Sequence, residues 1–126
     1  MIFIVGGKKQ GKTEYAKSLE QKGYVVCDDF QEFVKANMDE TGDDFSLEYE
    51  KLEPQIASYL DETFANCSNE KCVVVGMEMG YGVVPMDFKD RKLRELNGRA
   101  NCYLAKKADC VVRMVCGIPT VIKGSL

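Results

Sequence analysis

An eight-residue segment near the start of the chain has the residue types and spacing of a phosphate-binding loop. It fits the pattern GxxxxGKS/T and consists of Gly6, Gly7, Lys8, Lys9, Gln10, Gly11, Lys12 and Thr13. Glycines let backbone amides point at phosphate oxygens, and a helix that starts here adds the positive end of its dipole. Lys12 would then reach the β- and γ-phosphates of a nucleotide, and the Thr13 hydroxyl would bind Mg²⁺. The alternative is a glycine turn followed by a lysine-rich helix start.

Acidic residues follow two later apolar runs. Asp28 and Asp29 come directly after residues 24–27, and Glu78 lies just past residues 72–76. If both runs are parallel strands, their carboxyl ends lie at the edge of the sheet that faces the P-loop. Asp28 or Glu78 could then hold Mg²⁺, directly or through water, while the other accepts the proton of an attacking hydroxyl group. The alternatives are a helix N-cap for the aspartates and a plain surface position for Glu78.

Three arginines share one face of a helix predicted over residues 89–107. Arg91, Arg94 and Arg99 lie opposite the apolar stripe of that helix. Guanidinium groups in this arrangement can bind phosphates or the carboxylates of a neighbouring subunit. We expect Arg91 and Arg94 to contribute to nucleotide binding. A solvated helix face is the alternative.

The composition removes a large class of catalytic devices. The 126 residues include 17 Lys and Arg, 20 Asp and Glu, six Cys and no His. Without histidine there is no imidazole base, no Ser-His or Cys-His nucleophile pair and no His-bound metal. Any chemistry must therefore use backbone amides, carboxylates, lysines, arginines, hydroxyls or thiols. The net charge of −3 gives no reason to expect binding to nucleic acid.

Length and cysteine pattern predict one soluble domain over residues 1–126. A chain of this size can bury a hydrophobic core without disulfides or a structural metal. The six cysteines form no CxxC pair, so we expect reduced thiols that mostly pack in the core. No stretch approaches the roughly 18 apolar residues of a membrane span, and the N-terminus does not resemble a signal peptide. We therefore expect a cytoplasmic protein without a membrane span.

Apolar runs alternate with helical patterns along the chain. Strands are predicted at residues 2–5, 24–27, 72–76 and 110–116, with a turn through Pro119 into an edge strand at 120–123. Helices are predicted at residues 13–22, 30–37, 46–53, 56–64 and 89–107, with Pro54 separating the third from the fourth. The acidic stretch 38–44 reads as an exposed loop. Strands that are apolar throughout and alternate with helices predict a three-layer α/β, P-loop NTPase-like fold with a mainly parallel sheet and a C-terminal edge strand.

Several motifs in the second half of the chain add to the P-loop. They are Glu78-Met79-Gly80-Tyr81-Gly82-Val83-Val84-Pro85, Arg91 and Arg94, Gly98-Arg99-Ala100-Asn101, Ala108-Asp109-Cys110-Val111, Gly117-Ile118-Pro119 and Ile122-Lys123. In this combination the chain resembles the adenosylcobinamide kinase / adenosylcobinamide-phosphate guanylyltransferase family. The resemblance covers residues 1–18 and 72–123 and is weaker between them, where Asp28 stands at the family's acidic strand end.

The resemblance implies a kinase that uses ATP or GTP with Mg²⁺ to phosphorylate the aminopropanol hydroxyl of cobinamide, a corrinoid, and it implies a homotrimer. The family also transfers GMP from GTP through an enzyme histidine. This chain has no histidine, the segment between Thr13 and Asp28 is too short to hold the one the family uses, and Met77 replaces a usual asparagine. Guanylyl transfer is therefore not expected.

Two other hypotheses stay open at this point. One is a non-catalytic paralogue that binds nucleotide or a corrinoid as a sensor or an assembly subunit. The other is a P-loop kinase or GTPase with an unrelated substrate. No guanine-reading NKxD motif is present, so the sequence does not choose between ATP and GTP.

Overall fold

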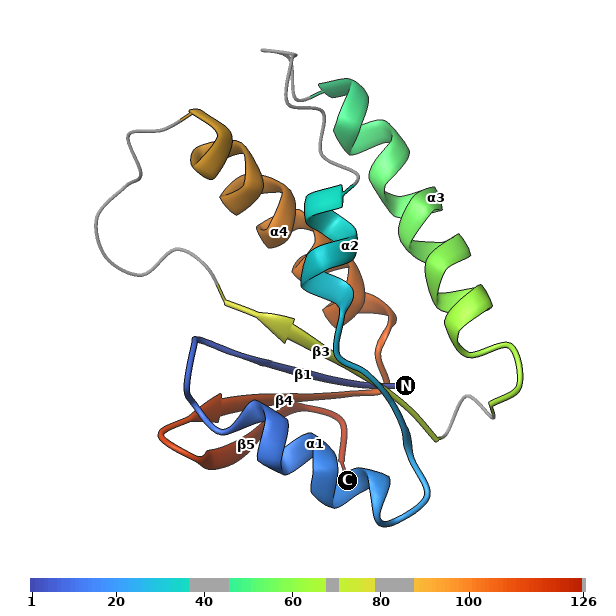
Figure 1. Ribbon diagram of the computed structural model, residues 1–126, viewed down its shortest axis with the longest axis vertical. Coiled ribbons are helices and arrows are strands. Elements are labelled where there is room, and N and C mark those ends of the chain that lie inside the picture. Colours follow the sequence, from blue (N-terminus) through green and yellow to red (C-terminus); the bar gives the residue numbers. More distant parts are fainter. Residues whose placement is uncertain (37–45, 68–70, 79–87, 126) are drawn as a thin grey trace.

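A five-stranded sheet with helices on both faces organises the computed structural model, which describes residues 1–36, 46–67, 71–78 and 88–125 (Figure 1). The strands are β1 (Ile2–Gly6), β2 (Val25–Cys27), β3 (Cys72–Met77), β4 (Cys110–Val115) and β5 (Ile118–Lys123). The helices are α1 (Lys12–Glu20), α2 (Phe30–Ala36), α3 (Ser46–Thr63) and α4 (Phe88–Lys107). The predicted acidic loop 38–44 and the segment 79–85 lie outside the described residues.

The strand order is β2-β3-β1-β4-β5. The first four strands are parallel to their neighbours, and β5 pairs antiparallel with β4 at the edge. This confirms the predicted α/β fold with a mainly parallel sheet and a C-terminal edge strand. No helix within the described ranges is long and apolar enough to cross a membrane.

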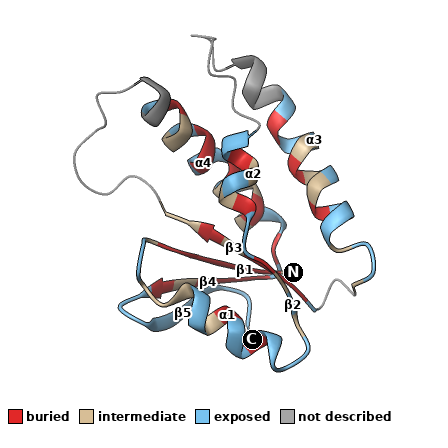
Figure 2. Cartoon of the chain, in the orientation of Figure 1, coloured by how far each residue is buried: buried red, intermediate tan, exposed pale blue. Residues whose placement is uncertain are grey.

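β1 lies in the middle of the sheet and is buried along its whole length. Its alternate side chains serve two cores, because successive residues of a strand point to opposite faces. Ile2 and Ile4 pack with residues of α1 on one face, whereas Phe3 and Val5 pack with α2, α3 and α4 on the other. Figure 2 shows the buried residues concentrated on β1, β3 and β4 and on the helix faces that cover the sheet, whereas β5 is exposed. The end of β1 is therefore held on both faces, and this is where the P-loop begins.

α3 is one continuous helix through Pro54, so the prediction of two helices divided at this residue is wrong. Proline removes one backbone hydrogen bond and crowds the preceding turn. Leu52, Ile56 and Leu60 are buried at a spacing of four residues and pack into the larger core. Burial of side chains of this kind contributes about 1.5–3 kcal/mol each. This burial outweighs the cost of one proline, whose own side chain is exposed.

The connection between β4 and β5 is a two-residue hairpin turn, and the predicted turn through Pro119 is wrong. Cys116 and Gly117 both have positive φ, at 52° and 76°. Two successive residues of this conformation match the twist of the flanking strands and reverse the chain tightly. Strand β5 therefore starts at Ile118, and Pro119 pairs with Met114. Proline is compatible with this place because β5 is an edge strand.

A small polar cluster joins the end of β2 to α3. The Cys27 thiol lies 3.2 Å from an Asp29 carboxylate oxygen and 3.1 Å from the Tyr59 hydroxyl. The Tyr59 hydroxyl also donates to the same oxygen of Asp29. The Tyr59 ring stacks on Phe33 with centroids 4.2 Å apart, so α2 is included in the contact.

The cluster holds one charge and two neutral groups at neutral pH. Hydrogen bonds from Tyr59 and Cys27 lower the pKa of Asp29. Burial raises the pKa of the Cys27 thiol to about 11, and burial together with Asp29 raises the pKa of Tyr59. Asp29 is therefore the ionised acceptor, and the thiol and the hydroxyl are its donors.

Substitution of Tyr59 by Phe should lower the free energy of unfolding by about 1 kcal/mol at pH 7, because the ring stays and the hydroxyl is lost. The folded pKa of Asp29 lies below its unfolded value of 3.8. The contribution of ionised Asp29 to the free energy of unfolding is therefore complete above that pH. It disappears as the pH falls through the folded pKa. The difference in free energy of unfolding between wild type and Y59F should shrink in the same pH range in urea titrations.

Y103F, which removes the exposed hydroxyl that accepts a hydrogen bond from Lys107, is the matched control. Equal midpoints for the two variants would contradict this account.

Candidate functional site

The P-loop connects β1 to α1 and opens a helix without a side-chain cap. Gly11 occupies the N-cap position with φ 90°, and among the described residues no side chain caps the first amides of α1. Lys9 also has a positive φ of 57°. Uncapped amides at a helix N-terminus attract anions, because they point outward and carry the positive end of the helix dipole. The loop thus has the geometry that phosphate binding requires.

The carbonyl oxygen of Gly6 joins three parts of the site. It accepts a hydrogen bond from Lys12 Nζ at 2.8 Å and another from the backbone N–H of Glu78 at 2.9 Å. A Cβ at Gly6 would lie 2.7 Å from the carbonyl oxygen of Met114, so a side chain does not fit here. Lys12 is half-exposed, and its partial burial lowers its pKa while the nearby charge of Glu78 opposes that shift.

The turn of the β4–β5 hairpin is hydrogen-bonded to the P-loop. The Cys116 N–H donates to Gln10 Oε1 at 2.5 Å, and the Gly117 N–H donates to the Gln10 carbonyl at 3.0 Å. A Cβ at Gly11 would come within 3.1 Å of Gly117 Cα. Gln10, a variable position in the pattern, therefore fixes the loop against the hairpin through its side chain and its carbonyl.

Glu78 forms a two-point ion pair with Arg113 of β4. Arg113 Nε lies 2.8 Å from Glu78 Oε1, and Arg113 Nη2 lies 3.1 Å from Oε2. The Glu78 side chain is 20% exposed and that of Arg113 is 43% exposed. The pair spans the end of β1, because β3 and β4 are its two neighbours in the sheet.

Two asparagines of α4 hold the backbone just before Glu78. Asn97 Nδ2 and Asn101 Nδ2 donate to the Met77 carbonyl at 2.7 and 2.9 Å. Within the described residues, the Oδ1 atoms of both amides are buried without a hydrogen-bond partner. Glu78 is therefore positioned by its own amide, by its carboxylate and by the peptide that precedes it.

The structure places the predicted residues in two groups. Gly6–Thr13 and Glu78 meet at the end of β1, as Gly6 and Glu78 share a hydrogen bond. Asp28 is exposed at the end of β2, which pairs with β3 and not with β1. Two strand spacings of about 4.8 Å thus separate its strand from the P-loop strand. Its neighbour Asp29 is the residue bound in the Cys27–Tyr59 cluster.

Arg91 and Arg94 lie on α4, six and three residues before Asn97. Asn97 contacts the end of β3, so residues 88–96, about 13 Å of helix, project past the carboxyl edge. Arg91 is exposed there and Arg94 is half-buried. Both arginines are thus on the side of the sheet where the P-loop lies.

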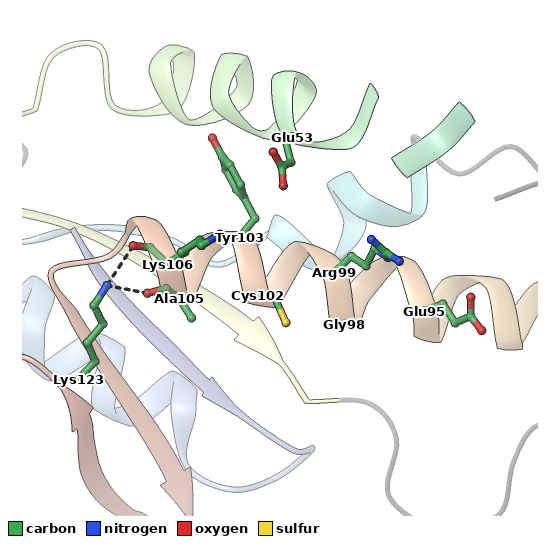
Figure 3. Close-up of a pocket in the computed structure, with 9 residues that line it drawn as sticks. All are labelled: Glu53, Glu95, Gly98, Arg99, Cys102, Tyr103, Ala105, Lys106 and Lys123. Atoms are coloured by element: carbon green, nitrogen blue, oxygen red, sulfur yellow. Dashed lines mark hydrogen bonds between the residues drawn. The ribbon is translucent and has the colours of Figure 1, made fainter. Parts of the chain in front are cut away.

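Arg99 belongs to a different surface. It lines a cavity of about 980 Å³ on the outer side of α4, whose lining residues include none from the P-loop. Figure 3 shows Tyr103 extending toward α3, where Glu53 lies, and Lys123 donating to the carbonyls of Ala105 and Lys106. The remaining lining residues are Glu95, Gly98 and Cys102.

Residues that sequence reasoning did not predict complete the site. Arg113 is the only charged residue in the apolar run of β4, and this could have marked it. Asn97 and Asn101 are four residues apart, a spacing that places both on one helix face. Their common target is a backbone carbonyl, for which the sequence carries no signal.

The oxygens at the P-loop fit a magnesium ion that arrives with a nucleotide. Within the described residues, no group of three or more His, Cys, Asp or Glu side chains could hold a metal by itself. Mg²⁺ needs only one or two protein oxygens when phosphates and waters supply the rest. The Thr13 hydroxyl in the first turn of α1 and the Glu78 carboxylate beside the loop are oxygens of this kind.

Strand, glycine loop, helix and neighbouring carboxylate together define a P-loop NTPase-like α/β protein. A model of the cobinamide kinase / cobinamide phosphate guanyltransferase family matches residues 17–122. The chain therefore belongs to this family. The P-loop residues 6–13 precede the matched range, so their assignment depends on the motif and the geometry.

A curated relative agrees with the family. The bifunctional adenosylcobalamin biosynthesis protein CobU of Escherichia coli K12 is 35% identical over 78 residues, which are 60% of this chain and 43% of that protein. The match thus spans less than half the length of the relative.

Substitution of Gly6 by Ala should lower the free energy of unfolding by about 1–3 kcal/mol, because the new methyl group meets a backbone carbonyl that must move. Gly98 gives a matched control. It is exposed in the middle of α4 with nothing within 4 Å of an added Cβ, so G98A should raise stability by up to about 1 kcal/mol. Urea unfolding of both variants measures the difference. Similar midpoints for G6A and G98A would show that the Gly6 contact is not tight.

Proposed function

We propose that the chain is a nucleoside-triphosphate-dependent kinase of cobalamin biosynthesis. In this proposal it transfers the γ-phosphate of ATP or GTP to the aminopropanol hydroxyl of cobinamide. Family membership supports the substrate class, and the E. coli relative, an adenosylcobalamin biosynthesis protein, supports the pathway. The observation that carries the proposal is the arrangement of Lys12 and Glu78 on the Gly6 carbonyl at the mouth of an uncapped helix.

The residues of the site divide the work of phosphoryl transfer. Backbone amides of the loop bind the phosphates, and Lys12 moves from the Gly6 carbonyl to the β- and γ-phosphate oxygens. Thr13 and one of the carboxylates hold Mg²⁺, which when bound neutralises phosphate charge. Arg91 and Arg94, on the projecting part of α4, approach the same edge and add positive charge.

The sheet order supports different tasks for the two carboxylates. Glu78 directly follows β3, the strand next to β1, and its backbone N–H donates to the Gly6 carbonyl, so it is the carboxylate beside the phosphates. Asp28 lies one strand further out, where an acceptor alcohol would approach the nucleotide. We infer that Asp28 accepts the proton of that hydroxyl and that Glu78 serves the metal. The sequence alone left these two roles open between Asp28 and Glu78.

Guanylyl transfer is not part of the proposal. A phosphoramidate of the kind that the family forms needs an enzyme histidine, and the sequence contains none. The proposed activity is therefore limited to phosphorylation.

One observation favours a second candidate, a non-catalytic protein that binds nucleotide or a corrinoid. Both oxygens of Glu78 are bonded to Arg113, which keeps the carboxylate occupied in the absence of nucleotide. A site that never releases this pair would bind phosphates without turnover. Calorimetric binding of nucleotide, without product at any time, would support this candidate over the kinase.

Incubation with cobinamide and Mg-ATP or Mg-GTP should add the mass of one phosphoryl group to cobinamide, and mass spectrometry distinguishes this from guanylylation. K12A should lower kcat/KM by about 10²–10³-fold, since a cation aimed at the transferring group is lost. K17A is the matched control, because Lys17 is exposed on α1 and outside the loop.

Equal rates for K12A and K17A would contradict the role of the P-loop. A guanylylated product would contradict the restriction to kinase activity. Nucleotide binding with no product in wild type would favour the non-catalytic candidate.

A further inference from the structure

Two cations and one carboxylate meet at the mouth of the P-loop. Lys12 Nζ is bonded to the Gly6 carbonyl, and so is the amide of Glu78, whose carboxylate is bonded twice to Arg113. The charge of Glu78 also acts on Lys12, because it raises the pKa that burial lowers. A phosphate at the loop would therefore arrive next to both cations.

The strand register places Arg113 at the right end of the sheet for such a contact. Arg113 pairs with Val5, the residue before Gly6, so it lies on the face of the sheet to which Val5 points. From there its side chain reaches across the end of β1 to Glu78, which directly follows β3 on the other side of β1. The side chain is 43% exposed, so solutes can reach it.

The ion pair lies at the end of the sheet where the phosphates bind in the proposed function. A guanidinium group binds carboxylate and phosphate in the same forked geometry. A phosphate group can therefore replace the Glu78 carboxylate on Arg113 without a change in the position of the arginine.

We propose that Arg113 is a phosphate-binding residue of the nucleotide site and that Glu78 is its counter-ion while no nucleotide is bound. This inference rests on the proposed function. Binding of a triphosphate exchanges one anion for another on the guanidinium group, and the released carboxylate becomes available beside the P-loop. The same exchange explains how a carboxylate that is paired in the empty site can serve the metal in the loaded one.

Calorimetric titration with inorganic tripolyphosphate in the presence of EDTA tests the exchange without nucleotide base, metal or turnover. R113M should weaken binding at least tenfold, because a charge-assisted contact to phosphate is lost. E78Q should strengthen binding several-fold, since the competing carboxylate is gone. D28N removes a negative charge at the same edge of the sheet, at the end of β2, which two strands separate from the β4 strand of Arg113. Its effect on binding should be smaller than that of E78Q. R113K should fall between wild type and R113M, as it keeps the charge and loses the fork.

R113M and E78Q should change the affinity for tripolyphosphate in opposite directions. This result distinguishes an exchange of anions on Arg113 from an ion pair that only stabilises the site. If both variants weaken binding equally, the pair only holds the site together and the proposal is wrong. If R113M binds like wild type while K12A does not bind, the role of Arg113 is wrong and the P-loop assignment stands. If wild type does not bind tripolyphosphate, both the inference and the proposed function fail. Thermal unfolding checks each variant, and R113K replaces R113M as the deciding variant if R113M does not fold.

Discussion

The carbonyl of Gly6 is the point on which the proposed site depends. It ends the central strand and accepts hydrogen bonds from Lys12 and from the amide of Glu78, so one oxygen sets the distance between loop and carboxylate. The absence of a side chain at Gly6 lets the Met114 carbonyl approach from β4. β1 itself is held by apolar contacts on both faces, and close packing of this kind restricts the movement of the strand that carries this oxygen.

Local patterns in the sequence were sufficient for much of the fold. Continuous apolar runs predicted β1 and β3, because a strand buried on both faces has no polar alternation. The glycine loop between a strand and a helix predicted the P-loop, and the stripe that includes Leu96 and Leu104 predicted α4. In each case the signal and the structure lie within a few neighbouring residues, so tertiary contacts did not need to be known.

The remaining features depend on contacts between distant residues. α3 continues through Pro54 because its apolar face has a core to pack on, and propensity alone does not show this core. The choice between Asp28 and Glu78 as the carboxylate beside the P-loop needs the strand order, which separates β2 from β1. The pairing of Glu78 with Arg113 joins residues 35 positions apart and requires β3 and β4 to flank β1. Composition and spacing contain none of this information.

The contact between Gln10 and the β4–β5 hairpin has a consequence for the order of folding. Cys116 and Gln10 are separated by 106 positions, so the hydrogen bond between them is among the longest-range contacts of the described residues. Contacts of this kind are slow to form because a large loop must close first. On the ribosome, the predicted phosphate loop emerges before the β4–β5 hairpin and acquires this support only after the hairpin has been synthesised. The loop therefore lacks these two hydrogen bonds while the residues between it and the hairpin are being added.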